Sequence, residues 1–557
     1  SGITTGLNVS GIITAQNGIN FNGTSTGLNV SGVTTVADLI ATTISVGGTL
    51  TYEDVTNVDS VGVVTARGLS IFGNTTGLQV ASGISTFQAL TATTINGINV
   101  GKGANSVNNN TVLGSGALDA AVTGANNTSI GANTLTLNTS GQKNSALGSG
   151  ALSGNTTGSH NTAIGYESMD QNTDGTNNVA VGSQTLDANT SGTHNVAIGQ
   201  DALGANTTAS SNTAVGANCL DAVTTGDRNT AVGRNALTDV VTHSANTAVG
   251  FYALEQNTAN SNTAVGAYAM DANTTGGDNC AVGSQALGAN TTGDNNTAMG
   301  VNALASNTTG TQNTAFGAQS LDAGNHSNCN AFGYQALSAN TTGASNCAFG
   351  SHALQLNTTG NNNSAFGHRA LDANTTGYEN SAFGSAALGA CTEGYENSAF
   401  GRNALSSLTD GDHNTAVGHD ALENVTTGSY NTAMGRDAGR NIVGGSNNIC
   451  IGENTNDAAN TTGVVAMGSF ALTTNTADYN VAIGYFAMQN NTSGVSNTAV
   501  GRNALSANTT AGYNTALGTT SLLNNTTGSQ NTCVGANSGY ANTTANNTNA
   551  FGYGALV

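Results

Sequence analysis

One pattern of apolar and polar positions recurs through most of the chain, from about residue 105 to the end. It aligns on the phrase Asn-Thr-Ala-Val-Gly, present for example at residues 229–233. The glycine of this phrase occurs 27 times, with 22 intervals of 17 residues and four of 16. Internal repetition of this kind indicates one long repeat array rather than a series of globular domains.

The repeat unit is N-T-A-V-G-x-x-A-L-x-A-N-T-T-G-x-x, and we number its positions 1 to 17 from the leading Asn. Position 4 is always Val, Ile, Leu, Met or Phe, and position 9 is Leu or Met in 24 units. A unit with two large apolar residues, a glycine just after one of them and an Asn-Thr-Thr-Gly turn at positions 12–15 does not provide a helical face. The pattern predicts an all-β, elongated β-solenoid (β-roll) of about 27 coils, with a short strand at positions 2–4 of each coil stacked about 4.8 Å above its equivalent.

Strand alternation places positions 2 and 4 on one face, and we expect that face to be the packed interior. In one run of coils position 4 is Phe while position 2 changes from Thr to Asn, Cys or Ser. Such an exchange of volume between neighbours is typical of close packing. The predicted structural core therefore includes Phe332, Phe349, Phe366, Phe383 and Phe400.

Small residues occupy the opposite face of the predicted strand. Position 3 is Ala in 23 units and position 5 is Gly. We expect these two positions to contact a neighbouring chain about a three-fold axis; the alternative is that Ala fills a narrow solenoid interior. Position 1 is Asn in 24 units, which predicts an asparagine ladder along the stack.

Positions 6 and 7 vary freely and predict an exposed corner. Its aromatic and basic residues are the candidate binding residues: Tyr166, Phe251, Tyr252, Tyr334, His368, Arg369, Tyr485 and Phe486. Position 10 often carries an acid, such as Asp187, Asp271 or Asp372. These acids could form a cation-binding ladder, but their interruption by Gly, Ser or Thr favours a solvated edge.

Residues 1–104 follow a different pattern. Val-, Ile- and Thr-rich runs alternate with Gly and Asn turns, and Gly11, Gly32, Gly62 and Gly83 are spaced by 21, 30 and 21 residues. This indicates consecutive strands in a looser β repeat. We therefore divide the chain into an N-terminal β-repeat shaft, 1–104, and the 17-residue-repeat solenoid, 105–557.

Composition excludes several functions. The chain has 10 basic against 30 acidic residues, a formal charge of −20, so it lacks the electrostatic footprint of a nucleic-acid-binding protein. No apolar run approaches membrane-spanning length, and we expect no membrane insertion. The histidines and the seven cysteines show no metal-ligand spacing, and nucleophile elbows and phosphate loops are absent, so we predict no metal, no cofactor and no enzymatic activity. The cysteines leave the redox compartment undetermined.

The unit "NTAVGRNALSANTT" resembles the β-roll head repeats of trimeric autotransporter adhesins, and more closely the longer repeats in tail-fibre and virion structural proteins of marine bacteriophages. The segment "TYEDVTNVDSVGVVTARGL" (51–69) is similar to parts of structural proteins of contractile-tailed cyanophages. The resemblance implies a parallel homotrimer, extracellular or virion-borne, that binds a host surface without catalysis.

The function expected is that of a structural fibre or spike: a rigid trimeric rod that displays attachment sites, as in a bacteriophage tail fibre or virion appendage. The alternative is a bacterial trimeric adhesin or a secreted extracellular filament. The expected partners are two further copies of the chain, a host cell-surface receptor or glycan, and more fibre segments or virion proteins at both ends, because both ends fall within a repeat. An ice-binding solenoid is disfavoured because the paired threonines of each unit lie in a turn.

Overall fold

A computed structural model describes residues 98–557, with the exception of 459, together with five short strands that precede them. The chain divides into two compact units, Ser1–Thr86 and Phe87–Val557. In the first unit β1 (Leu7–Ser10) pairs in parallel with β3 (Leu28–Ser31), and β2 (Ile13–Ala15) with β4 (Thr34–Val36). This offset equals the spacing of Gly11 and Gly32, so the predicted β repeat is confirmed for these strands; Gly62, Gly83 and the segment 51–69 lie outside the described residues.

The second unit begins with strands that differ in direction from the rest. β5 (Thr93–Ile95) and β6 (Ile98–Gly101) form an antiparallel pair, and β6 also pairs antiparallel with β7, the first strand of the repeat array. The 3-10 turn η1 (Ala104–Ser106) lies between β6 and β7. These elements precede the first coil, and the domain limit at residue 104 stays a prediction.

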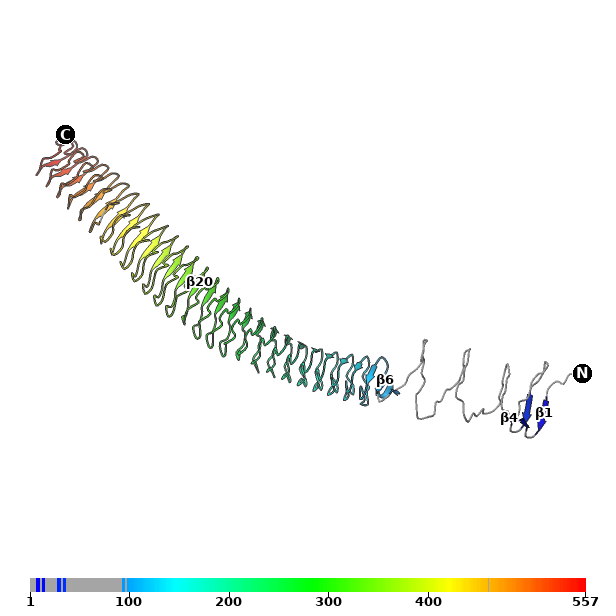
Figure 1. The fold of residues 1–557 in the computed structure, drawn as a ribbon. Helices are drawn as coiled ribbons and strands as arrows, with labels where there is room; N and C mark the ends of the chain where they lie inside the picture. The colour runs from blue at the N-terminus through cyan, green and yellow to red at the C-terminus, as the bar shows by residue number, and fades with distance from the viewer. Residues whose placement is uncertain are drawn as a thin grey trace, which may run out of the picture. The chain divides into compact units, whose positions relative to one another are not determined.

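From β7 onward each repeat contributes one strand, and each strand pairs in parallel and in register with the next (Figure 1). The 27 strands are β7 (Thr111–Gly114), β8 (Thr128–Ile130), β9 (Ser145–Leu147), β10 (Thr162–Ile164), β11 (Val179–Val181), β12 (Val196–Ile198), β13 (Thr213–Val215), β14 (Thr230–Val232), β15 (Thr247–Val249), β16 (Thr263–Val265), β17 (Cys280–Val282), β18 (Thr297–Met299), β19 (Thr314–Phe316), β20 (Asn330–Phe332), β21 (Cys347–Phe349), β22 (Ser364–Phe366), β23 (Ser381–Phe383), β24 (Ser398–Phe400), β25 (Thr415–Val417), β26 (Thr432–Met434), β27 (Ile449–Ile451), β28 (Val465–Met467), β29 (Val481–Ile483), β30 (Thr498–Val500), β31 (Thr515–Leu517), β32 (Thr532–Val534) and β33 (Asn549–Phe551). The predicted all-β solenoid is confirmed.

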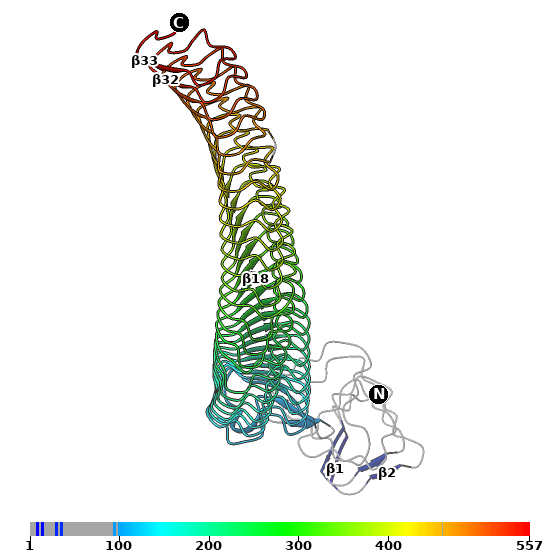
Figure 2. The same cartoon turned by 90° about the vertical axis from the view of Figure 1, so that its left-hand side faces the viewer.

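The stack of coils forms a gently curved rod whose strands line one side (Figures 1 and 2). At about 4.8 Å per coil, 27 coils extend for about 130 Å. Backbone bonds run along the axis in both directions: Thr162 N–H donates to the Asn178 carbonyl of the next coil (2.9 Å), and Gly165 N–H donates to the Leu147 carbonyl of the previous coil (2.8 Å). Each coil is therefore held mainly by its two neighbours, as in other solenoids.

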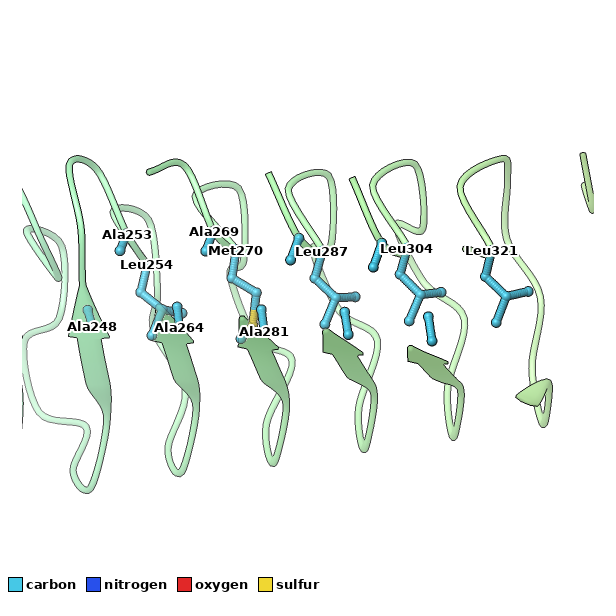
Figure 3. Packing of buried hydrophobic residues seen from close by; sticks show 14 of the residues in the cluster. Ala248, Ala253, Leu254, Ala264, Ala269, Met270, Ala281, Leu287, Leu304 and Leu321 are labelled. Atoms are coloured by element: carbon cyan, nitrogen blue, oxygen red, sulfur yellow. The ribbon is translucent and has the colours of Figure 1, made fainter. Parts of the chain in front are cut away.

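The interior is narrow and is filled by positions 3, 8 and 9. Leu254, Met270 and Leu287 point from one wall toward the strand wall, where the position-3 residues Ala248 and Ala281 face them (Figure 3). All five side chains have no exposed surface. The prediction that position 9 is core is thus confirmed, and the narrow-interior alternative for the position-3 Ala is correct; contact with a neighbouring chain through this residue is wrong.

Positions 2 and 4 lie on the outer face of the sheet, so the prediction that Phe332, Phe349, Phe366, Phe383 and Phe400 are core residues is also wrong. Their strands have only the central alanine buried, and Phe400 is 41% exposed. The physical reason is that the gap between the two walls is narrow, so position 3 is Ala in 23 units and otherwise Val, Ser or Cys. The exchange of volume between positions 2 and 4 is real, but it occurs between neighbours on the outside of the rod.

The position-5 glycines make close stacking possible. Gly367 has φ +145°, and a Cβ added to it would lie 2.4 Å from the carbonyl oxygen of Gly384 in the next coil. No side chain fits at that distance, and L residues rarely adopt this φ. The glycine therefore recurs because the backbones of successive coils pass too close for any other residue.

Two asparagine ladders form hydrogen bonds along the interior of the rod. Asn161 (position 1) donates its backbone N–H to Oδ1 of Asn144 in the previous coil (3.0 Å) and its Nδ2 to the Gly175 carbonyl of its own coil (2.8 Å). Asn172 (position 12) donates its Nδ2 to Oδ1 of Asn155 (2.7 Å) and to Gly175 (3.2 Å). The ladder at position 1 was predicted. The ladder at position 12 was not, because its asparagine was interpreted only as the first residue of the Asn-Thr-Thr-Gly turn.

Candidate functional site

The outer face of the sheet carries an apolar stripe along the rod, formed by the position-4 side chains. In its centre six phenylalanines stack in consecutive coils, from Phe316 to Phe400. The Phe332 and Phe349 rings have centroids 4.4 Å apart and lie 8° from parallel. Elsewhere the stripe is continued by exposed Leu, Ile, Val and Met, for example Leu147 and Leu517.

The candidate corner residues Phe251 and Tyr252 meet a third ring that the sequence reasoning did not select. Phe251 packs edge-on against Tyr252 (4.3 Å) and against Tyr268 (5.5 Å) of the next coil. Tyr252 and Tyr268 stack with centroids 5.7 Å apart and an interplanar angle of 4°. Tyr268 occupies position 7, like Tyr252, so the repeat register could have identified it despite the 16-residue interval.

Two other groups of candidates are joined through unpredicted rings. Tyr334 and His368, both exposed, contact His352 of the coil between them at 5.4 and 6.2 Å. Tyr485 and Phe486 pack against Phe470 of the previous coil, with centroid distances of 6.3 and 5.3 Å.

The remaining candidates have different neighbours. Arg369 is exposed, and its charge opposes the burial that raises the pKa of Asp372. Tyr166 is exposed, and the pKa of its hydroxyl is raised, first by a hydrogen bond with the Glu167 carboxylate. A second aromatic column, at positions 16 and 17, was missed: Tyr378 and Tyr395 stack at 4.9 Å and continue through His413 to Tyr430.

One groove in this surface lies beside the Tyr252–Tyr268 stack. It has a volume of about 340 Å³ and is lined by Tyr268, Asp271, Gln285, Gly288, Ala289 and Ala305. These residues come from positions 7, 10 and 11 of three consecutive coils.

Most of the position-10 acids are half-buried at the edge of the coils, whereas Asp119 is exposed. Burial is the largest cause that raises the pKa of the Asp187, Asp221, Asp271, Asp322 and Asp372 carboxyl groups. Gly204 occupies position 10 in the coil between Asp187 and Asp221. A Cβ added to Gly204 would lie 3.0 Å from Oδ1 of Asp221 and 3.6 Å from Oδ1 of Asp187, so the glycine leaves space between the two carboxylates.

Within the described residues one cluster has the spacing of a metal site: His419, Asp420 and Asp437. Its carboxylates already have partners. Asp420 Oδ2 lies 3.0 Å from His419 Nδ1, and Asp437 lies 3.5 Å from Arg436 and 3.7 Å from Arg440. Arg436 and Arg440 connect Asp437 with Glu453 and Glu423 in an ion-pair network on the rod surface, beside the His419–Asp420 pair.

The seven cysteines are free thiols, and most are buried. Burial raises the pKa of Cys219 and Cys329 to about 11 and that of Cys391 and Cys450 to about 12. These thiols stay protonated near neutral pH, so they are poor nucleophiles and poor metal ligands.

Comparison with protein-family models, curated proteins and solved structures finds no match. Among the described residues no helix is long and apolar enough to cross a membrane.

Proposed function

We propose that the protein is a rigid structural fibre that holds attachment sites at fixed spacing. The observation that carries the proposal is the unbroken in-register pairing of 27 strands, which makes each coil a copy of the one below. A solenoid of this length is stiff, and its outer face exposes the same repeat positions once in every coil. The described surface provides long shallow rows of side chains, which suit adhesion and assembly better than catalysis.

Copies of the chain associate through the position-4 stripe. Over about 130 Å of rod the stripe amounts to an exposed apolar patch on the order of 1,000 Å², larger than the few hundred Å² that monomers usually expose. A partner that covers it along its length must share the coil spacing, and a second copy of this chain does. A parallel homotrimer, which the repeat resemblance implies, brings three such stripes together on one axis.

The biological setting that fits best is a virion appendage such as a bacteriophage tail fibre, located outside the host cell. The likeness of the repeat phrase to marine phage fibre repeats supports this assignment over a bacterial adhesin. Threefold presentation of the corner residues turns weak single contacts into avidity. The function needs no cofactor and no chemical step.

The test has two parts. Sedimentation equilibrium of the full chain is expected to give three times the 54.9 kDa chain mass, and Phe366→Glu in the stripe is expected to weaken the assembly, whereas Ser385→Glu at an exposed corner is not. Fluorescently labelled protein is expected to bind some members of a panel of bacteria that includes marine cyanobacteria. A monomeric rod would refute the assembly, and failure to bind any cell would refute attachment.

A further inference from the structure

The groove beside Tyr268 arises from a change in side-chain size along position 10. Successive coils carry Asp271, Gly288 and Ala305 there, so a carboxylate is followed by two coils with almost no side chain. Met270 and Leu287 point into the core (Figure 3), and the residues that follow them lie on the outer edge. The missing side chains hollow the surface into a groove of about 340 Å³.

An aromatic ring forms one wall of this groove. Tyr252 covers one face of the Tyr268 ring in a parallel stack at 5.7 Å, and Phe251 supports the edge at 5.5 Å. The stack holds the Tyr268 ring in place. The other face of this ring is directed toward the next coil, where Gln285 occupies position 7. Tyr268 is 40% exposed, so the ring is available to a ligand.

Two polar groups face the groove from its floor and far wall. Oδ1 of Asp271 lies 3.6 Å from the point where a Cβ of Gly288 would stand, which places this oxygen over the hollow. Gln285 supplies an amide that both donates and accepts. The sequence has no Lys, Arg or His between His243 and His326, so no basic side chain of these coils neutralises Asp271.

This combination selects one class of ligand. A ring face, a carboxylate acceptor and an amide in a shallow groove match a sugar ring, which offers an apolar C–H face and several hydroxyl groups. An anionic ligand is disfavoured because the nearby charges are all acidic. A quaternary ammonium group could lie on the ring face, but it has no hydrogen-bond donors for Asp271 and Gln285. Aromatic cages for such cations need a second ring facing the first, and here the second ring, Tyr252, is stacked behind Tyr268.

We propose that Tyr268, Asp271 and Gln285 form a binding site for a neutral hexopyranose unit of a surface glycan. The proposal rests on the attachment function and names its ligand. The sugar stacks on the free face of Tyr268, donates hydroxyl hydrogens to Asp271 and exchanges hydrogen bonds with Gln285.

The chain offers a matched control for this site. Gly389 follows Asp372 at position 10 as Gly288 follows Asp271, and the added Cβ has the same 3.3 Å approach to a carbonyl oxygen at both glycines. At position 7, however, Arg369 and Ala386 replace Tyr268 and Gln285. Gly288→Gln fills the proposed site, whereas Gly389→Gln makes the same change where no ring is present.

The experiment is saturation-transfer NMR on the assembled full chain with methyl glucosides, galactosides and mannosides, and with N-acetylneuraminic acid and choline as the anionic and cationic probes. At least one neutral hexoside is expected to bind, with affinity reduced at least tenfold by Tyr268→Ala and by Gly288→Gln and unchanged by Gly389→Gln. Circular dichroism confirms that the variants fold.

Binding of none of the neutral hexosides, binding of choline or the sialic acid alone, or equal binding by wild type and Gly288→Gln overturns the site. Cell binding separates this inference from the attachment function. A Gly288→Gln rod that still binds cells at full strength refutes the sugar site and leaves attachment intact. Wild-type protein that binds hexoside but no cell refutes attachment and leaves the site.

Discussion

Two segments of the same rod fill the same interior position with opposite chemistry. In the coils of Asn340, Asn357 and Asn374, position 12 forms a buried amide ladder; Asn357 donates its Nδ2 to Oδ1 of Asn340 (2.8 Å) and accepts from Asn374 (2.6 Å). In the next four coils position 12 is apolar and fully buried: Cys391, Leu408, Val425 and Ile442. The strands of both segments keep the same parallel register.

This contrast indicates that the residue at position 12 must match its neighbours along the stack and need not be of one type. Within the amide segment each position-12 side chain hydrogen-bonds to another amide, and within the apolar segment each one lies next to another apolar side chain. At the boundary, Oδ1 of Asn374 is buried with no hydrogen-bond partner among the described residues, because Cys391 follows it. Oδ1 of Asn206 is orphaned in the same way before Val223. The energetic cost of mixing is thus concentrated at the junctions.

The largest expected effect tests whether the two segments share one backbone. Gly367→Val in the amide segment and Gly418→Val in the apolar segment both place a side chain against the next coil, where a Cβ would lie 2.4 Å from a carbonyl oxygen. Each is expected to lower the local unfolding free energy by about 4 kcal/mol or more, measured by hydrogen exchange of the peptides that cover the coil.

The control for these glycine variants is Ser385→Ala, at an exposed corner, with an expected change within about 0.5 kcal/mol. If Gly418→Val alone were tolerated, the segments would differ in backbone geometry and not only in their filling.

The second prediction places each residue type in the wrong segment. Asn357→Leu leaves Oδ1 of Asn340 without a partner and removes one of the two hydrogen bonds at Nδ2 of Asn374 and at the Gly360 carbonyl. Leu408→Asn buries an amide between Cys391 and Val425, which cannot satisfy it. Both are expected to cost roughly 2–4 kcal/mol in local stability, read by the same exchange measurement, and a cost below about 0.5 kcal/mol for either one would contradict the matching rule.

The third prediction concerns the 16-residue coil 313–328, which buries a histidine. His326 is 3% exposed, and neither ring nitrogen has a hydrogen-bond partner among the described residues. Burial lowers its pKa to about 4 from 6.5. The unfolded chain therefore binds the proton more readily, so this coil has its full stability above pH 6.5 and loses up to about 3 kcal/mol as the pH falls toward 4.

The coil of Asp457, in which Asn456 replaces the position-9 leucine, is expected to respond in the opposite direction. Burial raises the pKa of this carboxyl to about 6, so protonation below that pH favours the folded coil. Hydrogen exchange at pH 7 and pH 4.5, corrected for the intrinsic exchange rate, compares the two coils. In His326→Gln the acid loss should disappear; if it persists, another group is responsible.

The periodicity of the sequence was sufficient to predict the stacked coils, the buried position 9 and the first asparagine ladder. It could not predict which face of the strand is inside, because alternation gives two faces and not their direction. The backbone added a feature that no propensity suggests: the position-9 leucines, such as Leu237 with φ 54°, adopt the left-handed conformation. The tight turn of each coil, in which the leucine side chain is fully buried, accounts for leucine in that conformation.

The candidate site was predicted less completely than the fold. Tyr268 and His352 were missed because single rings were judged by their prominence in the sequence rather than by their register with the next coil. The groove depends on the absence of side chains at Gly288 and Ala305, which a search for chemical groups does not detect.

The smallest expected effect is the most specific for the junction argument. Cys391→Asn extends the amide ladder by one coil: the new Nδ2 donates to the orphaned Oδ1 of Asn374, while the new Oδ1 meets Leu408 and is orphaned instead. Because one unsatisfied oxygen replaces another, the local stability is expected to change by less than about 1 kcal/mol. Val425→Asn, in the middle of the apolar segment, buries a new unsatisfied amide and satisfies no orphaned oxygen. The opening constant measured by hydrogen exchange should therefore rise at least ten times more for Val425→Asn than for Cys391→Asn. Equal effects of the two substitutions would mean that each coil prefers its own residue regardless of its neighbours.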